Sequence, residues 1–221
     1  DHDDIDSTTL IITIRGANDE PEIRVVGSGE EGGDRYSVEL TEDDGTLKTE
    51  GTLSIKDVDK TNTVSVSVKE VEITGHDLPV GLDSEKIKGM LAFVSETVLG
   101  DNETENDHGI EWKFDSDGQA FDFLPEEGEL TLTYTIEADD GRGGKATHPV
   151  IITIKGTNDK PVAVDDINSV IDGEVAEVKA NVIDGREIEG VLVGQDTDPD
   201  HGDKLTLIKI KPFDSEDDPT D

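Results

Sequence analysis

Apolar and polar residues alternate along several short stretches of the chain. Val64–Val68 and Leu130–Ala138 place apolar side chains at every second position, and Leu53–Ile55 and Trp112–Phe114 repeat the pattern over shorter lengths. A period of two turns one face of a β-strand inward and the other toward water. Glycine, aspartate and asparagine separate these stretches, as they do in turns. The pattern therefore predicts an all-β fold, either a sandwich or a barrel.

One segment follows a different period. Between Ser84 and Leu99 the apolar residues recur at helical spacing, at Ile87, Met90, Leu91, Val94 and Val98. Ser84 is suited to cap the N-terminus of such a helix. We expect one short amphipathic helix here, packed against the strands.

A stretch of sequence occurs twice. Leu10–Pro21 reads LIITIRGANDEP and Val150–Pro161 reads VIITIKGTNDKP, with Gly16 and Gly156 140 positions apart. Each copy is a β-branched run suited to a strand, followed by Gly, Asn-Asp and Pro, which end it. Such a repeat is typical of the last strand of one unit entering a linker to the next.

The two copies divide the chain into three parts. We expect residues 1–20 to be the C-terminal strand and linker of a preceding unit, and residues 21–157 to form one complete unit. Residues 158–221 then begin a following unit, and they are short for a sandwich, which is consistent with truncation.

The charge of the chain limits what it can bind. Its 221 residues include 55 Asp and Glu against 19 Lys and Arg, a formal net charge of −36. This charge excludes nucleic acid as a partner, because phosphate binding needs a basic surface, and it argues against an anionic membrane surface. Self-repulsion of this kind opposes compaction, so bound divalent cations or high ambient salt must offset it. Because the acids are clustered rather than spread, cations are favoured.

The sequence also lacks cysteine, long apolar runs and a signal peptide pattern. The chain has no cysteine, which excludes disulfides and thiolate metal sites. No apolar run reaches the length of a transmembrane helix, so we expect no membrane insertion of this segment. The chain opens at Asp1 without a signal peptide pattern, and we expect an internal segment of a longer protein.

Acidic and amide side chains form four clusters, two of which follow the repeated strands. The clusters are Asn18-Asp19 with its repeat Asn158-Asp159; Asp57 and Asp59, preceded by Glu42–Asp44; Asp139 and Asp140; and Asp196, Asp198, Asp200 and Asp203. Calcium takes six to eight oxygen ligands from carboxylates, amides and carbonyls. Crowded carboxylates without a cation would have raised pKa values and cost stability. With no Cys and little His nearby, the clusters favour Ca²⁺ over zinc or copper.

Two longer stretches resemble a known family. Glu42–Asp59 resembles the start of VCBS repeats, and Phe121–Gly144 with the following strand and linker resembles their closing half. In the third part, Pro161–Asp166 and Asp196–Leu207 resemble bacterial cadherin-like repeats. These resemblances imply a tandem Ig/cadherin-like Greek-key β-sandwich with one short helix in the middle unit.

The resemblance also implies a role. Such repeats occur in tandem in large RTX-type adhesins on the bacterial cell surface, where they are extracellular extenders rigidified by calcium and support adhesion or biofilm formation. The partners would be adjacent repeats of the same chain, while other domains bind a host or surface ligand. The implied ligands are Asn18, Asp19, Glu42, Asp57, Asp59 and Asp139 at the first junction, and Asn158, Asp159, Asp196, Asp198 and Asp200 at the second.

Three other functions remain to be weighed. An enzyme is disfavoured, because the five histidines are scattered and no zinc, nucleophile-elbow or phosphate-loop motif occurs. A calcium-dependent sugar- or peptide-binding tip domain could use Trp112, Phe114, Phe121 and Phe123, although a single Trp in such a fold is more often part of the core. A salt-adapted protein without specific sites would respond to salt in general rather than to calcium.

Overall fold

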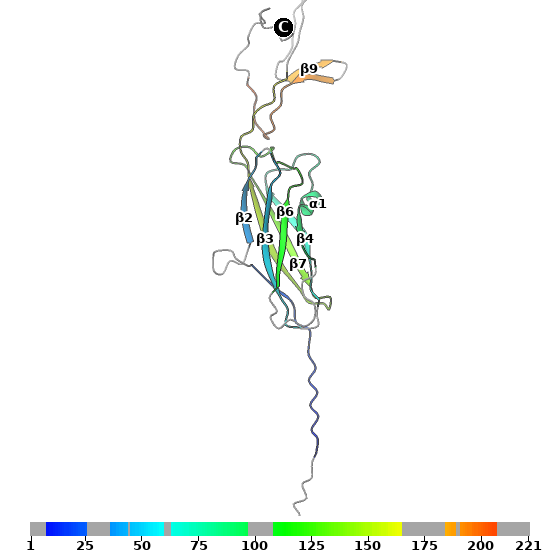
Figure 1. Cartoon of the computed structure of the whole chain (residues 1–221). Helices are drawn as coiled ribbons and strands as arrows, with labels where there is room; N and C mark the ends of the chain where they lie inside the picture. The colour runs from blue at the N-terminus through cyan, green and yellow to red at the C-terminus, as the bar shows by residue number, and fades with distance from the viewer. Residues whose placement is uncertain are drawn as a thin grey trace, which may run out of the picture.

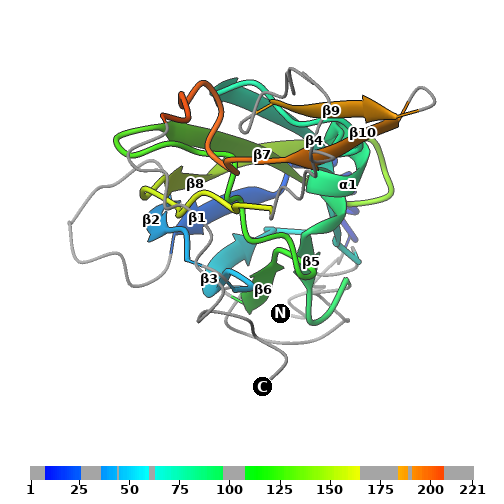
Figure 2. The ribbon, with the colours of Figure 1, turned by 90° about the horizontal axis from the view of Figure 1, so that it is seen from above.

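Two four-stranded sheets pack face to face in this computed structural model, which describes residues 8–25, 36–43, 45–59, 63–96, 108–164, 184–188 and 191–206. The first sheet has the order β1-β3-β6-β5 and is antiparallel throughout. The second has the order β2-β8-β7-β4, in which β2 runs parallel to β8. Figure 1 shows the sandwich with its strands upright, and Figure 2 shows the two sheets from above as two layers.

The elements have these bounds. The first sheet consists of β1 (Glu22–Val25), β3 (Lys48–Lys56), β6 (His108–Asp115) and β5 (Leu91–Phe93); the second consists of β2 (Tyr36–Thr41), β8 (Lys145–Lys155), β7 (Glu129–Asp139) and β4 (Ser65–Gly75). One helix, α1 (Ser84–Gly89), joins β4 to β5, and β9 (Asp184–Ile188) pairs with β10 (Val191–Gln195) in a separate hairpin.

The connections form a Greek key. From β1 to β8, every connection except β5–β6 and β7–β8 crosses from one sheet to the other, so that strands distant in sequence pair with each other. The orders β1-β3-β6-β5 and β4-β7-β8 correspond to the two sheets of an immunoglobulin-type sandwich. The predicted all-β sandwich with one short helix is therefore confirmed.

Alternation along the strands builds the core. In β7 every second residue, from Leu130 to Ala138, has no exposed surface, while the intervening threonines are partly exposed. Trp112 and Phe114 of β6 are also buried between the sheets, at 0% and 1% exposure. Tyr36 meets the Trp112 ring edge-on, with ring centroids 4.9 Å apart, and a Cβ at Gly51 would come within 2.6 Å of that indole. Glycine is thus required where β3 passes under the indole.

The helix is shorter than its apolar spacing predicts. It ends at Gly89, and Leu91–Phe93 instead form β5, which pairs with Trp112–Phe114 of β6. Asp83, not Ser84, is the N-cap, since its carboxylate accepts the Lys86 N–H at 2.9 Å. The prediction was wrong beyond the first turns because sheet pairing overrides a local helical period.

The helix and the segment after it protect the free edge of β4. The Lys88 ammonium donates to the Lys69 carbonyl at 2.8 Å, and the Val66 N–H donates to the Glu96 carbonyl at 3.0 Å. Satisfying edge groups in this way discourages pairing with a second chain.

The two copies of the repeated segment have different surroundings. Val150–Ile154 lies in β8 between β2 and β7, and Ile152 and Ile154 are fully buried. Residues 8–21 contain no strand, and the assignment of Leu10–Ile14 to the last strand of a preceding unit stays a prediction. Figure 1 shows this segment leaving one end of the sandwich, where no described strand flanks it. Among the described residues, no helix is long and apolar enough to cross a membrane.

Ile154→Ala should lower the free energy of unfolding by about 2–5 kcal/mol, because it removes a fully buried side chain. The matched control is Ile14→Ala at the equivalent position of the first copy, where the side chain is 90% exposed and the change should stay within about 0.5 kcal/mol. Urea unfolding followed by Trp112 fluorescence measures both. Equal losses in the two variants would contradict the assignment of the core.

Candidate metal centre

Strand directions decide which acidic residues meet. Because β2 and β8 are parallel and in register from Tyr36↔Val150 to Thr41↔Lys155, the residues after both strands lie at the same end of the sandwich. We call this the second end; it also holds the loop between β6 and β7. The first end is where residues 18–21 enter and where β3 and β7 finish. Glu42 therefore belongs to the second end and not to the first, where the sequence had grouped it.

Glu42 is a buried carboxylate at the second end. It is 2% exposed, and its Oε1 accepts the Thr157 N–H at 2.6 Å and the Thr157 hydroxyl at 2.8 Å. Its Oε2 is buried without a hydrogen-bond donor. One ligand oxygen each from Glu42, Asp122 and Asp159 lies within 4.8 Å of the other two. These three carboxylates converge from β2, the β6–β7 loop and the linker after β8.

A glycine allows this convergence. Gly156 donates its N–H to the Gly128 carbonyl at 2.8 Å, and a Cβ at Gly156 would collide with the carbonyl oxygens of Leu124 and Pro125. The repeated Gly before Asn-Asp thus lets the β6–β7 loop close on the linker. The same loop carries Asp122, whose Oδ1 is buried without a donor.

The third part of the chain adds further carboxylates at this end. Asp200 is 4% exposed, and its Oδ2 accepts the Asp159 N–H at 2.9 Å, while its Oδ1 is buried without a donor. Asp198 accepts the Asp200 N–H at 3.1 Å. Oxygens of Asp198, Asp200 and Asp203 also lie within 4.8 Å of one another.

Two of the predicted ligands at this end have other partners. Asp196 accepts the Val164 N–H at 2.8 Å, and exposed Asn158 donates its side-chain amide to the Asp159 carbonyl at 2.7 Å. Among the predicted residues, the second end thus brings Glu42 and Asp159 together in one acidic group and Asp198 and Asp200 in the other.

The first end gathers a different set. Asn18 donates its side-chain amide to Asp140 Oδ2 at 2.7 Å, and the Asp19 N–H donates to Asp59 Oδ2 at 2.7 Å. The Asp59 N–H in turn donates to Oδ1 of buried Asp57 at 2.8 Å. Four of the residues predicted for this end are therefore together, joined by Asp140.

The linkers at the two ends share one hydrogen-bond frame. At each end the backbone N–H of the linker aspartate, Asp19 or Asp159, donates to the second carboxylate of an Asp-x-Asp pair. The strand pairings correspond as well, since Glu22↔Lys56 in β1 and β3 matches the isolated bridge Val162↔Thr197. The third part of the chain thus starts in the same way as the middle sandwich.

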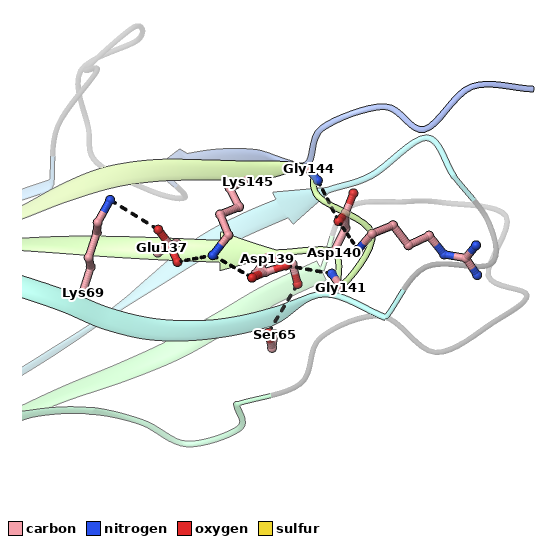
Figure 3. A network of polar contacts seen from close by, with 9 residues as sticks. Ser65, Lys69, Glu137, Asp139, Asp140, Gly141, Gly144 and Lys145 are labelled. Carbon is pink, nitrogen blue, oxygen red and sulfur yellow. Dashed lines mark hydrogen bonds and ion pairs between the residues drawn. The ribbon is translucent and has the colours of Figure 1, made fainter.

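Asp139 lies apart from both sets. It is the last residue of β7 and lies on the outward-facing side of this strand. Its Oδ2 pairs with the Lys145 ammonium at 2.8 Å, and its Oδ1 accepts the Gly141 N–H at 2.8 Å. Lys145 also pairs with Glu137 at 2.9 Å, and Glu137 meets Lys69 at 3.4 Å (Figure 3). The hydrogen bond from Lys145 lowers the pKa of both carboxyls below their ordinary values and raises the pKa of Lys145.

Asp140, one residue further, points to the opposite side. It is 3% exposed, and its Oδ1 accepts the N–H groups of Arg142 at 2.7 Å and Gly144 at 2.9 Å. The hydrogen bond from Asn18 is the main cause that holds the pKa of this carboxyl below its ordinary value. Strand alternation, which turns neighbours to opposite faces, separates the two aspartates.

Sequence reasoning left Asp122, Asp140 and Asp203 out of the ligand set. Asp140 could have been found from the period of two, because Glu137 and Asp139 share the outward face of β7. Asp122 has no signal of its own, since its position depends on how the β6–β7 loop folds onto Gly156.

The second end has the composition of a site for a hard cation. Both acidic groups found among the described residues consist of carboxylates alone, and oxygen ligands favour Ca²⁺ or Mg²⁺ over softer metals. An aromatic ligand site is not formed, since Trp112, Phe114, Phe121 and Phe123 are at most 6% exposed. These four side chains belong to the core.

Several solved structures are similar to the chain at low levels. A PapD-like domain of human CEP192 shares 12% identity at a TM-score of 0.38, covering 69% of this chain and 96% of that chain. The CooA pilin subunit from enterotoxigenic Escherichia coli shares 10% identity at 0.38, covering 61% and 97%. The N-terminal domain of PorA shares 14% identity at 0.33, covering 62% and 97%. Because these TM-scores are low, the assignment of the sandwich rests on the strand pairing of this chain.

The sequence comparisons find no relatives. No family model matches the chain, and no curated protein matches it.

Lys145→Met should raise the pKa of Glu137 and Asp139 toward ordinary values, because it removes the cation that stabilises their charged forms. Their depressed folded pKa values contribute stability above the ordinary values of 4.5 and 3.8, and this contribution is lost as pH falls through the folded values. The stability difference between wild type and variant should therefore shrink on acidification.

Carboxyl carbon NMR titration and acid unfolding measure these two effects. Lys48→Met is the matched control, because Lys48 pairs with Asp115 on the other sheet and its loss should leave Glu137 and Asp139 unchanged. Unaltered pKa values in Lys145→Met would show that the ion pairs do not form in solution.

Proposed function

We propose that this chain is a calcium-binding extender segment of a secreted bacterial adhesin, in which ions at the second end fix one unit against the next. The observation that carries the proposal is a set of buried carboxylate oxygens without a donor, Glu42 Oε2, Asp122 Oδ1 and Asp200 Oδ1. Glu42 and Asp200 are each more than nine-tenths buried. Buried charges persist when they are paired or coordinate a metal.

A cation solves an electrostatic problem at this end. Three carboxylates converge within 4.8 Å in each of the two acidic groups, on a chain of net charge −36. Carboxylates this close repel one another. A divalent ion reverses this repulsion and supplies the interaction that the donorless oxygens lack.

Calcium fits the donor set better than magnesium. Glu42, Asp122 and Asp159 come from three separate segments of the chain, and such carboxylates suit the variable geometry of Ca²⁺. Magnesium requires near-ideal octahedral geometry and retains several waters. Zinc and copper prefer imidazole or thiolate ligands, which neither acidic group contains.

The arrangement supports a mechanical role. An ion held by Glu42, Asp122 and Asp159 would connect the middle sandwich to the linker. The Asp159 N–H donates to Asp200 Oδ2 in the second acidic group, so the third part of the chain is joined to the same linker. Figure 1 shows the first and last described segments leaving opposite ends of the sandwich, as expected of a module in a row.

The wider role follows from the motif resemblance described for the sequence. We infer an extracellular location at a bacterial cell surface, adjacent repeats as the partners, and adhesion or biofilm formation through other domains of the same protein. We infer no catalysis for this segment.

Calcium should stabilise the protein against heat, because a ligand that binds only the folded state raises the free energy of unfolding, by about 2.7 kcal/mol at 100 times its Kd. Melts in EDTA, calcium, magnesium and sodium chloride of matched ionic strength measure this. Sodium chloride at equal ionic strength should raise the melting temperature less than calcium does. An equal rise would indicate a salt-adapted protein without specific sites.

Single substitutions locate the ion. Glu42→Gln and Asp122→Asn should each abolish most of the calcium-induced shift in melting temperature, because they remove a ligand charge while keeping the side-chain shape. Asp43→Asn is the matched control, since Asp43 is exposed and its carboxylate accepts the N–H of nearby Gly45. A full calcium response in Glu42→Gln would place the ion elsewhere.

Removal of calcium by a chelator should make the position of the third part relative to the sandwich variable. With calcium, small-angle X-ray scattering of the full chain should fit one extended conformation; after EDTA the maximum dimension should vary over an ensemble, because the third part is released from the second end. Glu42→Gln in calcium should scatter like the wild type in EDTA, and Asp43→Asn should not. Identical curves with and without calcium would contradict the extender role, even if calcium bound.

A further inference from the structure

The two ends of the sandwich hold their linkers by different means. Both share the hydrogen bond from the linker aspartate to an Asp-x-Asp carboxylate. They differ at the preceding asparagine. Both side-chain amides donate to the carbonyl of the following aspartate, Asn18 to Asp19 at 3.1 Å and Asn158 to Asp159 at 2.7 Å. Asn18 donates in addition to a carboxylate, Asp140 Oδ2, at 2.7 Å.

Asp140 is built to receive an amide. It is 3% exposed, and N–H donors occupy both of its oxygens: Arg142 and Gly144 at Oδ1, and Asn18 at Oδ2. Gly144 leaves room for this contact, since a Cβ there would collide with Asp140 Oδ2 and lie 3.1 Å from Asn18 Nδ2. The β7–β8 turn thus forms a pocket for the Asn18 amide.

The charge of Asp140 is therefore satisfied by protein groups. Three N–H dipoles point at this carboxylate, and hydrogen bonds to a charged group are stronger than those between neutral groups. At the second end, in contrast, Glu42 Oε2 and Asp122 Oδ1 are buried and receive no donor. A cation binding to Asp140 Oδ2 would have to displace the Asn18 amide.

We propose that Asn18 and Asp140 form a cation-independent latch that fixes the linker to the first end of the sandwich. The contrast with the second end rests on the function proposed above, whereas the latch itself does not. Chelation would then release the chain on one side of the sandwich only, and each unit would keep the linker that precedes it. Asn18 acts as a positioning residue here and not as a metal ligand.

Spin-label distances test the latch in the full chain, which has no cysteine of its own. One labelled pair, Arg15→Cys with Glu72→Cys, reports the first end; a second pair, Glu72→Cys with Lys204→Cys, reports the second end. All three positions are exposed. The latch predicts a narrow first-end distance distribution both in calcium and in EDTA. Loss of the first-end peak in EDTA, with recovery in calcium, overturns it.

Asn18→Asp separates the latch from a metal site. Aspartate has no N–H to donate and repels Asp140, so the latch predicts loss of the first-end peak with and without calcium. A cation-held end would instead keep its peak in calcium, because aspartate is a calcium ligand, and that result overturns the latch. Asn18 is exposed, so folding is not at risk, and Asn158→Asp should leave the first-end peak unchanged.

The second pair keeps the two proposals distinguishable. Loss of its peak in EDTA supports calcium at the second end. A second-end distance peak that is the same with and without calcium contradicts the proposed function. The latch is still tested independently by the first-end pair and by Asn18→Asp.

Discussion

The parallel pairing of β2 with β8 is the constraint on which the candidate site depends. Because Thr41 aligns with Lys155, the chain leaves both strands at the same end, and Glu42 meets Thr157 directly. Antiparallel pairing would have carried Glu42 to the opposite end. The remaining parts of the second end follow from this alignment, since Gly156 then admits the β6–β7 loop and brings Asp122 to the linker.

An acid-rich chain needs several ways to stabilise carboxylates, and this fold separates them in space. On the outer face of the second sheet, Lys145 neutralises Glu137 and Asp139 (Figure 3). At the first end, backbone and amide N–H groups surround Asp140. At the second end, no donor among the described residues reaches Glu42 Oε2, Asp122 Oδ1 or Asp200 Oδ1, which is why we propose an ion there.

Under the two proposals, the different stabilisation of the carboxylates at the two ends has a mechanical consequence. A unit that holds its own preceding linker by hydrogen bonds and its following linker by calcium would loosen at one defined place per repeat. Stiffness would then be set by the calcium concentration, while each sandwich keeps its core. The core includes Trp112 and Leu132, which have no exposed surface.

The strands with alternating residues (β3, β4, β6, β7 and β8), the lean core and the clusters of acidic side chains could be read from the order of residues, because a period of two and a repeated Gly-x-Asn-Asp are local properties. Pairing between distant strands decided the rest. It shortened the helix to Ser84–Gly89 by drawing Leu91–Phe93 onto β6, moved Glu42 to the second end, and brought in Asp122 from a loop without a motif. Local patterns indicate which residues can act together; which of them meet depends on strand direction and loop closure, which only the folded chain determines.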